Sequence, residues 1–157
     1  MSQGWIRTKV GDFSLHVAWA VNPGEILVLY GPSGAGKTLT LRAIAGLLYP
    51  QAGRVEVGGT VVHDSGAGWW VAPHKRGIGY VPQSYDLFPH LTVAKNIAYG
   101  LYRWPNELRH KRVETLLDSF RLASLAGQWP DRLSGGERQR IAFMRAVVSD
   151  CPVLFAD

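Results

Sequence analysis

Residues 26–38 read Ile-Leu-Val-Leu-Tyr-Gly-Pro-Ser-Gly-Ala-Gly-Lys-Thr, an apolar run that leads into a glycine-rich loop. Five apolar residues in a row are typical of a strand covered on both faces. Residues 31–38 match the pattern G-x-x-x-x-G-K-[ST], in which backbone N–H groups turn toward an oxyanion. The apolar residues beyond the loop recur at helical spacing: Leu39, Leu41, Ile44, Leu47 and Leu48. The stretch therefore predicts a buried strand, a phosphate-binding loop and a helix that ends near residues 46–50.

The chemistry of this loop follows from its residue types. The candidate phosphate-binding residues are Gly31, Pro32, Ser33, Gly34, Ala35, Gly36, Lys37 and Thr38. The Lys37 ammonium can reach the β- and γ-phosphates of a nucleotide, and the Thr38 hydroxyl can ligate Mg²⁺. The N-terminus of the following helix adds partial positive charge. A glycine-rich turn without a ligand is the simpler alternative, and the strand and helix on either side favour phosphate binding.

The segments around this unit show both strand and helix periods. Residues 13–21 alternate apolar and polar side chains, as a half-buried strand does. Gly58-Gly59 separates residues 54–57 from 60–62, which predicts a hairpin because both turn positions need a positive φ. Residues 77–81 predict another buried strand. From Thr92 onward the pattern is helical, with two apolar stripes: Val113, Leu116, Leu117 and Phe120, and Ile141, Met144 and Val148.

The chain ends with Val153-Leu154-Phe155-Ala156-Asp157, which indicates a buried strand followed by a carboxylate. An aspartate in this position is most simply a strand-ending cap. Together with the phosphate-binding loop, however, Asp157 is a better candidate for holding Mg²⁺ through water.

The composition excludes several classes of protein. With 157 residues and 46% apolar content, the chain can bury one core, and it contains no apolar run near the ~20 residues that cross a bilayer. The net charge of +5 is spread from Arg7 to Arg145, which favours a solvated surface or an anionic nucleotide over a nucleic-acid tract. A single Cys151 fits a reducing, cytoplasmic setting. The five histidines lack metal-ligand spacing, and none is assigned to zinc.

Residues 133–140, Leu-Ser-Gly-Gly-Glu-Arg-Gln-Arg, open the last predicted helix. Ser134 as N-cap and Glu137 three residues later form a capping box, which is a sufficient structural explanation for these two residues. A capping box does not require Gly135 and Gly136. Two consecutive glycines suggest instead that another group approaches the backbone closely, at a second helix N-terminus that can receive an anion.

The same residues resemble a known family. The sequence LSGGERQR is similar to the signature motif of ATP-binding cassette proteins, and Val81-Pro82-Gln83 is similar to their Q-loop. With the phosphate loop and Asp157, four motifs follow the order of the family. The resemblance implies that Ser134, Gly135 and Gly136 contact the γ-phosphate of ATP held by a second such domain. Two domains would then close head to tail around two nucleotides. It also implies that Gln83 lies near Mg²⁺ and the attacking water, so that Thr38, Gln83 and Asp157 surround the metal.

A narrower resemblance concerns residues 73–83, 87–93 and 96–97, which are similar to the ATPase subunits of bacterial importers and most similar to the molybdate type. It implies an ATP hydrolase that drives import of molybdate or a related oxyanion. The implied partners are a second nucleotide-binding domain, transmembrane permease subunits and, indirectly, a substrate-binding protein, with no nucleic acid. The implied location is the cytoplasmic face of the cell membrane. Two alternatives stay open: a soluble cassette ATPase acting on nucleic acid or ribosomes, and an inactive truncated remnant.

These patterns predict an α/β fold, namely a P-loop NTPase core with a mostly parallel sheet and an N-terminal antiparallel part. The β-rich core is expected at 1–91 and 150–157, and a helical subdomain with the signature helix at 92–149. The family's catalytic glutamate would follow Asp157, so residues 1–157 alone are expected to be an incomplete and inactive domain. Trp5 and Phe13 are candidates for stacking on adenine, although packing is the simpler role for each. The aromatic residues between 85 and 104 are either core or a groove for a permease helix.

Overall fold

The computed structural model describes residues 1–157. Contacts within the chain divide it into two units, Met1–Ile78 together with Asp157, and Gly79–Ala156. This division groups residues 79–91 and 150–156 with the helices, whereas the sequence pattern groups them with the β-rich part. The functional boundaries at residues 92 and 149 stay a prediction, and each unit is described by itself below.

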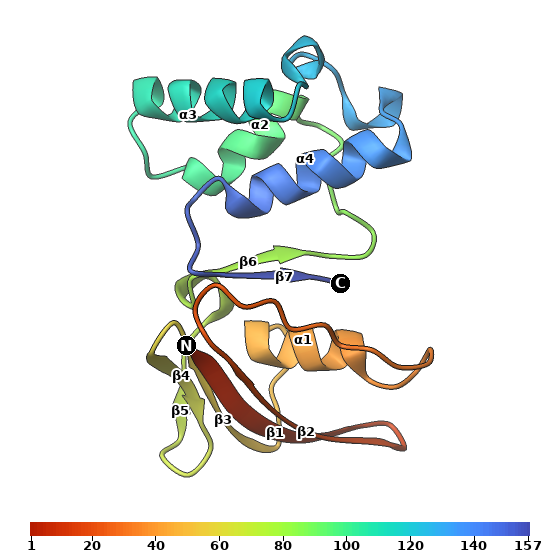
Figure 1. Ribbon diagram of the computed structural model, residues 1–157, viewed down its shortest axis with the longest axis vertical. Coiled ribbons are helices and arrows are strands. Elements are labelled where there is room, and N and C mark those ends of the chain that lie inside the picture. The colour runs from red at the N-terminus through yellow and green to blue at the C-terminus, as the bar shows by residue number, and fades with distance from the viewer. The chain divides into compact units, whose positions relative to one another are not determined.

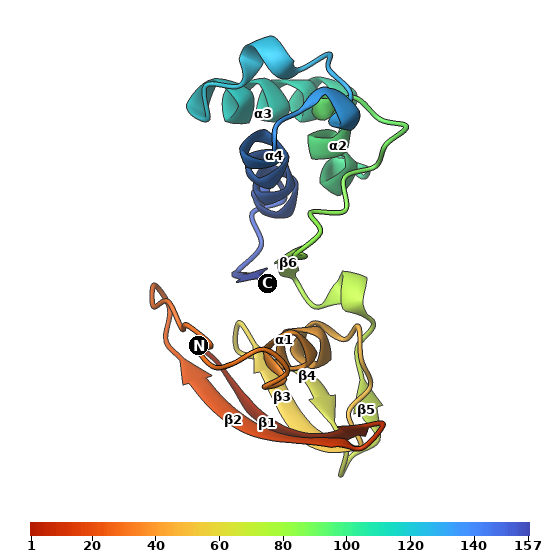
Figure 2. The same ribbon diagram turned by 90° about the vertical axis from the view of Figure 1, so that its right-hand side faces the viewer.

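The first unit contains a five-stranded antiparallel sheet in the order β2-β1-β3-β4-β5. Its strands are β1 (Ser2–Val10), β2 (Phe13–Val21), β3 (Ala52–Val57), β4 (Thr60–Asp64) and β5 (Trp69–Trp70). Helix α1 (Lys37–Ala45) lies against one face of this sheet, as both ribbon views show (Figures 1 and 2). The buried residues Ile6, Val55 and Ile44 come from the sheet and the helix. Their burial gives this unit its own apolar core.

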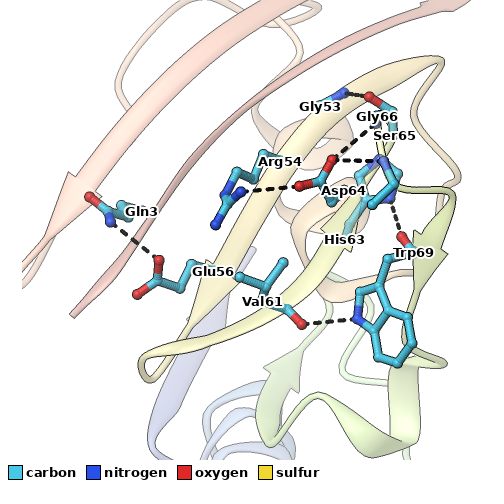
Figure 3. Close-up of polar contacts among 11 residues, drawn as sticks. Gln3, Gly53, Arg54, Glu56, Val61, His63, Asp64, Ser65, Gly66 and Trp69 are labelled. Atoms are coloured by element: carbon cyan, nitrogen blue, oxygen red, sulfur yellow. Dashed lines mark hydrogen bonds and ion pairs between the residues drawn. The ribbon is translucent and has the colours of Figure 1, made fainter.

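The predicted hairpin is confirmed. Gly58 and Gly59 connect β3 to β4 with φ values of 57° and 82°, in the region that glycine enters without steric cost. Arg54 pairs with Asp64 across the two strands, with 3.1 Å between Nη1 and Oδ2 (Figure 3). The other carboxylate oxygen of Asp64 accepts hydrogen bonds from the backbone N–H groups of Gly66 and Ala67. These contacts fix the loop that leads to β5.

Strand β1 is an element that the sequence reasoning missed. Ile6 and Thr8 are buried, whereas Trp5 and Lys9 are exposed, so the strand has the period of two that marks a half-buried strand. This alternation was present in the sequence. The period is hard to recognise because one buried position holds the polar Thr8 and one exposed position holds the apolar Trp5.

The predicted buried strand at residues 26–30 is wrong for these 157 residues. The segment is irregular and belongs to neither sheet. Ile26 is 90% exposed and Tyr30 is 99% exposed. A continuous apolar run is buried only where other strands pair with it and helices cover both of its faces. No other segment of the chain pairs with residues 26–30 or covers both of their faces. The apolar run is therefore exposed and does not form the predicted strand.

The second unit contains three helices and two strands: α2 (Val93–Ala98), α3 (Asn106–Ser119), α4 (Gly135–Val147), β6 (Ile78–Val81), whose first residue belongs to the first unit, and β7 (Val153–Ala156). Strands β6 and β7 pair and run in the same direction (Figure 1). Short 3₁₀ turns connect the elements of the chain: Pro73–Lys75, Tyr99–Leu101, Ala123–Leu125 and Pro130–Arg132. None of the helices combines the length and the apolar character needed to cross a membrane.

Both predicted apolar stripes of the helices are confirmed as core. The buried cluster of the second unit includes Val113 and Leu117 from α3, and Ile141 and Met144 from α4. The closing strand is also confirmed as a strand, but not as a buried one. Its residues Val153–Phe155 are half-buried and Ala156 is exposed, because β6 is its only hydrogen-bonded neighbour. The combination of an antiparallel part, a parallel pair and a helical part agrees with the predicted α/β class.

Candidate phosphate and magnesium site

Helix α1 begins with an N-terminus that no side chain caps. Gly36 is the N-cap residue with φ 88°, and it offers no side-chain acceptor to the first-turn N–H groups. Gly34 also has a positive φ, 82°. The first turn of the helix carries no acidic residue. Several N–H groups and the positive end of the helix dipole are therefore available to an external anion.

Lys37 folds back over the loop that precedes it. Its Nζ donates to the carbonyl oxygens of Gly31 and Pro32, at 2.8 Å in both cases. These bonds hold the ammonium charge beside the loop backbone instead of leaving it free in solvent. A cation and a set of uncapped N–H groups thus lie together in the predicted phosphate-binding segment.

Thr38 and Asp157 meet although 119 positions separate them in the sequence. The Thr38 hydroxyl donates to Oδ1 of Asp157 at 2.7 Å. A hydroxyl and a carboxylate are the hard oxygen ligands that Mg²⁺ prefers, and the ion keeps several waters when it binds through one or two protein groups. The donor set therefore fits magnesium. Gln83, the third predicted magnesium residue, belongs to the second unit, where its side chain is exposed in a turn between Pro82 and Tyr85.

Of the two aromatic candidates for adenine, Phe13 is the one beside the phosphate loop. A Cβ atom built on Gly36 would lie 3.1 Å from Cε1 of Phe13 and 2.9 Å from Cδ1 of Leu15. Trp5 instead packs edge-on against His16, with 6.5 Å between the ring centroids. Phe13 is 38% exposed. Its ring therefore flanks the loop and keeps a free surface, while adenine stacking itself stays a prediction.

Arg76 is a residue whose importance the sequence reasoning missed. It is 3% exposed, and its Nη1 donates to the carbonyl of Ile44 at 2.7 Å, at the C-terminal end of α1. Its Nε donates to Val71 at 2.9 Å, and its guanidinium lies 4.2 Å from the ring centroid of Trp70. Burial lowers the pKa of Arg76 to about 10, so the group remains charged at neutral pH. The charge lies at the negative end of the phosphate-loop helix.

No pattern in the sequence predicts the contact of Arg76 with the C-terminal end of α1. A Cβ atom on Gly46, which ends α1 with φ 82°, would lie 2.5 Å from Nε of Arg76. Gly46 and Arg76 are 30 positions apart. Only the folded arrangement shows that the glycine makes room for the guanidinium.

The N-terminus of α4 contains the predicted capping box. The Ser134 hydroxyl oxygen accepts from the Glu137 N–H at 3.3 Å, and Oε2 of Glu137 accepts from the Ser134 N–H at 2.7 Å. The Ser134 hydroxyl also donates to the same carboxylate at 2.7 Å. The side-chain bond, the backbone bond and the charge of Arg140 lower the pKa of Glu137. At neutral pH an ionised carboxylate therefore satisfies this helix end.

Gly135 and Gly136 are not required by the packing of the chain itself. A Cβ atom built on either residue would meet no atom within 4 Å, and both residues are exposed. Gly135 and Gly136 are the first two residues of α4, and alanine in place of glycine where the backbone permits it stabilises a protein by about 0.4–1 kcal/mol. The sequence thus carries two helix-weakening residues at a place where the fold would accept alanine, which leaves the backbone open to a close approach.

Comparison with known proteins identifies the family of this chain. The profile of the family described as ABC transporter matches residues 15–157. The chain belongs to the ABC transporter family. The resemblance expected from the four sequence motifs and the expected fold class are thereby confirmed.

Two curated ABC relatives have similar sequences. The molybdenum import ATP-binding protein ModC of Mesorhizobium japonicum is 40% identical over 152 residues, which cover 97% of this chain and 41% of that protein. The putative 2-aminoethylphosphonate import ATP-binding protein PhnT of Salmonella typhimurium is 43% identical over 140 residues, covering 87% of this chain and 36% of that protein. The chain spans less than half the length of these two relatives.

A solved ABC structure agrees with the fold. The dimeric ATP-binding cassette MJ0796, in a post-hydrolysis state bound to ADP and Pi, matches with a TM-score of 0.80 and 30% sequence identity. The match covers 100% of this chain and 73% of that chain. The two units of this chain therefore both have counterparts in a cassette that binds a nucleotide.

Proposed function

We propose that this chain binds Mg-ATP and forms the front part of the ATP-hydrolysing subunit of an ABC importer. The observation that carries the proposal is the meeting of the Thr38 hydroxyl and the Asp157 carboxylate at 2.7 Å, directly beside the uncapped N-terminus of α1. Thr38 and Asp157 are both exposed, so packing of the core does not explain why they lie together. Binding of one magnesium ion by both side chains would explain their contact.

The residues of the loop have separate roles in this proposal. The backbone N–H groups of residues 31–38 surround the phosphates, and the Lys37 ammonium moves from the carbonyls of Gly31 and Pro32 to the β- and γ-phosphates. Thr38 and Asp157 would hold the magnesium ion, and Gln83 is the further ligand that the family resemblance implies. The ion would neutralise charge on the phosphates. Phosphoryl transfer depends mainly on such positioning and charge stabilisation.

The second anion site acts on the nucleotide of another subunit. Ser134, Gly135 and Gly136 contact the γ-phosphate of ATP bound by a partner copy, so that two domains close around two nucleotides. The open Cβ positions of both glycines and the dimeric state of the similar MJ0796 cassette support this arrangement. The Ser134 hydroxyl now donates to Glu137, so it must turn away from that carboxylate to donate to a phosphate.

The cargo is an oxyanion in this proposal, because the similar subunits serve molybdenum and 2-aminoethylphosphonate import according to their names. Molybdate is our preferred candidate. The chain itself does not bind the cargo. It docks on transmembrane permease subunits at the cytoplasmic face of the membrane, and a substrate-binding protein delivers the solute to the permease.

The first prediction tests nucleotide binding. Lys37→Ala should weaken binding of a fluorescent ATP analogue by at least about a hundredfold, because it removes the charge that faces the β- and γ-phosphates. Equilibrium binding is measured by fluorescence anisotropy with and without Mg²⁺. Lys95→Ala is the matched control, since Lys95 is exposed on α2 of the other unit.

The control should bind the analogue like the wild type, and both variants should melt at the wild-type temperature. Equal affinity of the Lys37→Ala variant and the wild type would refute the assignment of the loop. If the wild type binds the analogue with the same affinity with and without Mg²⁺, the magnesium role of Thr38 and Asp157 is refuted. The assignment of the phosphate loop would not be affected by that result.

A further inference from the structure

The loop after Gln83 is held by a side chain of the signature helix α4. Arg145 donates from Nη1 to the carbonyl of Asp86 at 2.6 Å and from Nη2 to the carbonyl of Tyr85 at 2.8 Å. Its guanidinium also lies over the ring of Phe88, 5.1 Å from the centroid. One planar group thus binds two successive carbonyls, which suits the rigid fork of a guanidinium better than the single nitrogen of an ammonium.

The two residues that Arg145 binds have an unfavourable backbone. Tyr85 has φ 63° and Asp86 has φ 42°, in the left-handed region that side chains other than glycine rarely enter. They directly follow a turn in which the Tyr85 N–H donates to the Pro82 carbonyl at 2.9 Å, with Gln83 inside the turn. The contacts of Arg145 therefore stabilise strained residues at the place that sets the direction of Gln83.

A second buried side chain holds the far end of the same loop. Asn96 of α2 is fully buried, and its Oδ1 accepts from the Phe88 N–H at 2.8 Å. Its Nδ2 donates to the carbonyls of Phe88 and Leu91 at 3.1 and 2.9 Å. Asn96 thus fixes residues 88–91 to α2. Residues 85–86 are connected to α4 instead, by the two hydrogen bonds of Arg145 and by the packing of Tyr85 against Ala142 and Ala146.

Packing and charge agree with a fixed attachment. Val81, just before the loop, is buried against Ala142 and Ala146 of α4. Burial lowers the pKa of Arg145, and the charge of Asp86 acts in the opposite direction. A cation that is withdrawn from water in this way keeps its position only while its acceptors are in place.

We infer that Arg145 is a positioning residue that ties the Gln83 loop to the helix carrying Ser134. The inference rests on the proposed function, in which Gln83 serves the nucleotide of its own subunit and Ser134 that of the partner. Helix α4 carries the candidate γ-phosphate contact at its N-terminus and the attachment of the Gln83 loop near its C-terminus. A movement of α4 on dimer closure would therefore move Gln83 as well.

The test uses the full-length protein with three substitutions. Arg145→Met removes both hydrogen bonds and keeps much of the apolar stem, and Arg145→Lys keeps the charge and can bind one carbonyl. Lys111→Met is the control, because Lys111 is exposed on α3 of the same unit and lies outside the signature motif. Arg145→Met should lower kcat for ATP hydrolysis about tenfold and change KM for ATP by less than about twofold, because the phosphate loop is untouched. Arg145→Lys should lie between it and the wild type, and Lys111→Met should match the wild type.

Hydrogen exchange supplies a measurement that does not depend on activity. Amides of residues 83–87 should exchange at least about fivefold faster in Arg145→Met, whereas the amides of α4 should keep their protection. The dependence of hydrolysis on Mg²⁺ should also shift to higher concentration, because Gln83 no longer points steadily at the ion. A loss limited to folding would instead raise exchange throughout the second unit.

Wild-type kcat in Arg145→Met, or unchanged exchange at residues 83–87, would overturn the inference. If Arg145→Met does not fold, Arg145→Lys decides: exchange and kcat equal to the wild type would overturn it. Failure of the proposed function is recognised separately, because the wild-type protein would then neither bind nor hydrolyse ATP, while the exchange measurement would still report whether Arg145 holds the loop.

Discussion

Arg76 and Arg145 each use a guanidinium to hold a piece of backbone that serves the candidate site. Arg76 binds the last turn of the phosphate-loop helix, and Arg145 binds the residues after Gln83. Both guanidinium groups donate their hydrogen bonds to backbone carbonyl oxygens and not to a carboxylate. Arginine suits this role because it stays charged when burial lowers its pKa, and because its several N–H groups satisfy more than one carbonyl.

At the scale of single residues, we predict that Arg76→Met destabilises the protein by about 2 kcal/mol. The substitution removes two hydrogen bonds from a charged donor and leaves the Ile44 carbonyl without this partner. Thermal unfolding with and without ATP measures the effect. Arg42→Met is the matched control, because Arg42 lies on the exposed face of the same helix.

The control should change the free energy of unfolding by less than about 0.5 kcal/mol. The two variants lose the same charge, so a difference between them reports the buried contacts of Arg76. Equal melting temperatures for Arg76→Met and the wild type would contradict the structural account of α1.

At the scale of elements, structures formed by residues close in sequence could be predicted. Structures that depend on pairing with distant segments could not. The turn at Gly58-Gly59 and the capping box of Ser134 and Glu137 involve residues close in sequence, and both are confirmed. The strand expected at 26–30 is not formed, because pairing depends on distant segments that an apolar run does not specify. The same reason explains why the contact of Arg76 with Ile44 was missed.

The candidate site was predictable to a similar extent. The pattern of residues 31–38 identifies the phosphate loop, because the required residues are contiguous. The meeting of Thr38 and Asp157 followed from the family resemblance, and the structure places them in contact. The position of Phe13 beside Gly36 and the attachment of the Gln83 loop to Arg145 require tertiary structure, since nothing in the local sequence of either residue indicates its partner.

Helix α4 gives an element-scale prediction in which stability and activity change in opposite directions. Gly136→Ala should raise the free energy of unfolding by about 0.5 kcal/mol, because no atom obstructs the added methyl group and the unfolded chain loses freedom. ATP hydrolysis by the full-length protein should fall at least about tenfold, because the methyl group stands where a partner's phosphate approaches the backbone.

Denaturant unfolding and phosphate release are measured on the same preparation. The matched control is Gly127→Ala, because Gly127 likewise has no atom within 4 Å of its built Cβ and lies outside the signature motif. Hydrolysis at the wild-type rate in Gly136→Ala would show that nothing approaches this helix end closely.

At the scale of the whole molecule, we propose that the chain carries two different halves of a nucleotide site. The first unit holds the phosphate loop with Thr38 and Asp157, and the second holds the capped N-terminus of α4 with Ser134 and its two exposed glycines. In the proposed dimer each nucleotide lies between the first half from one copy and the second half from the other. A symmetric pair then forms two identical composite sites.

The most direct test of this account is ATP hydrolysis by a mixture of two full-length variants, Lys37→Ala and Ser134→Arg. Each variant alone should be inactive, because both composite sites of its homodimer lack one half. A mixed dimer should contain one intact site, formed by Lys37 of the second variant and Ser134 of the first. Random mixing should therefore restore about a quarter of wild-type turnover if the sites act independently. A mixture as inactive as its separate components, with mixed dimers shown to form, would contradict the shared site.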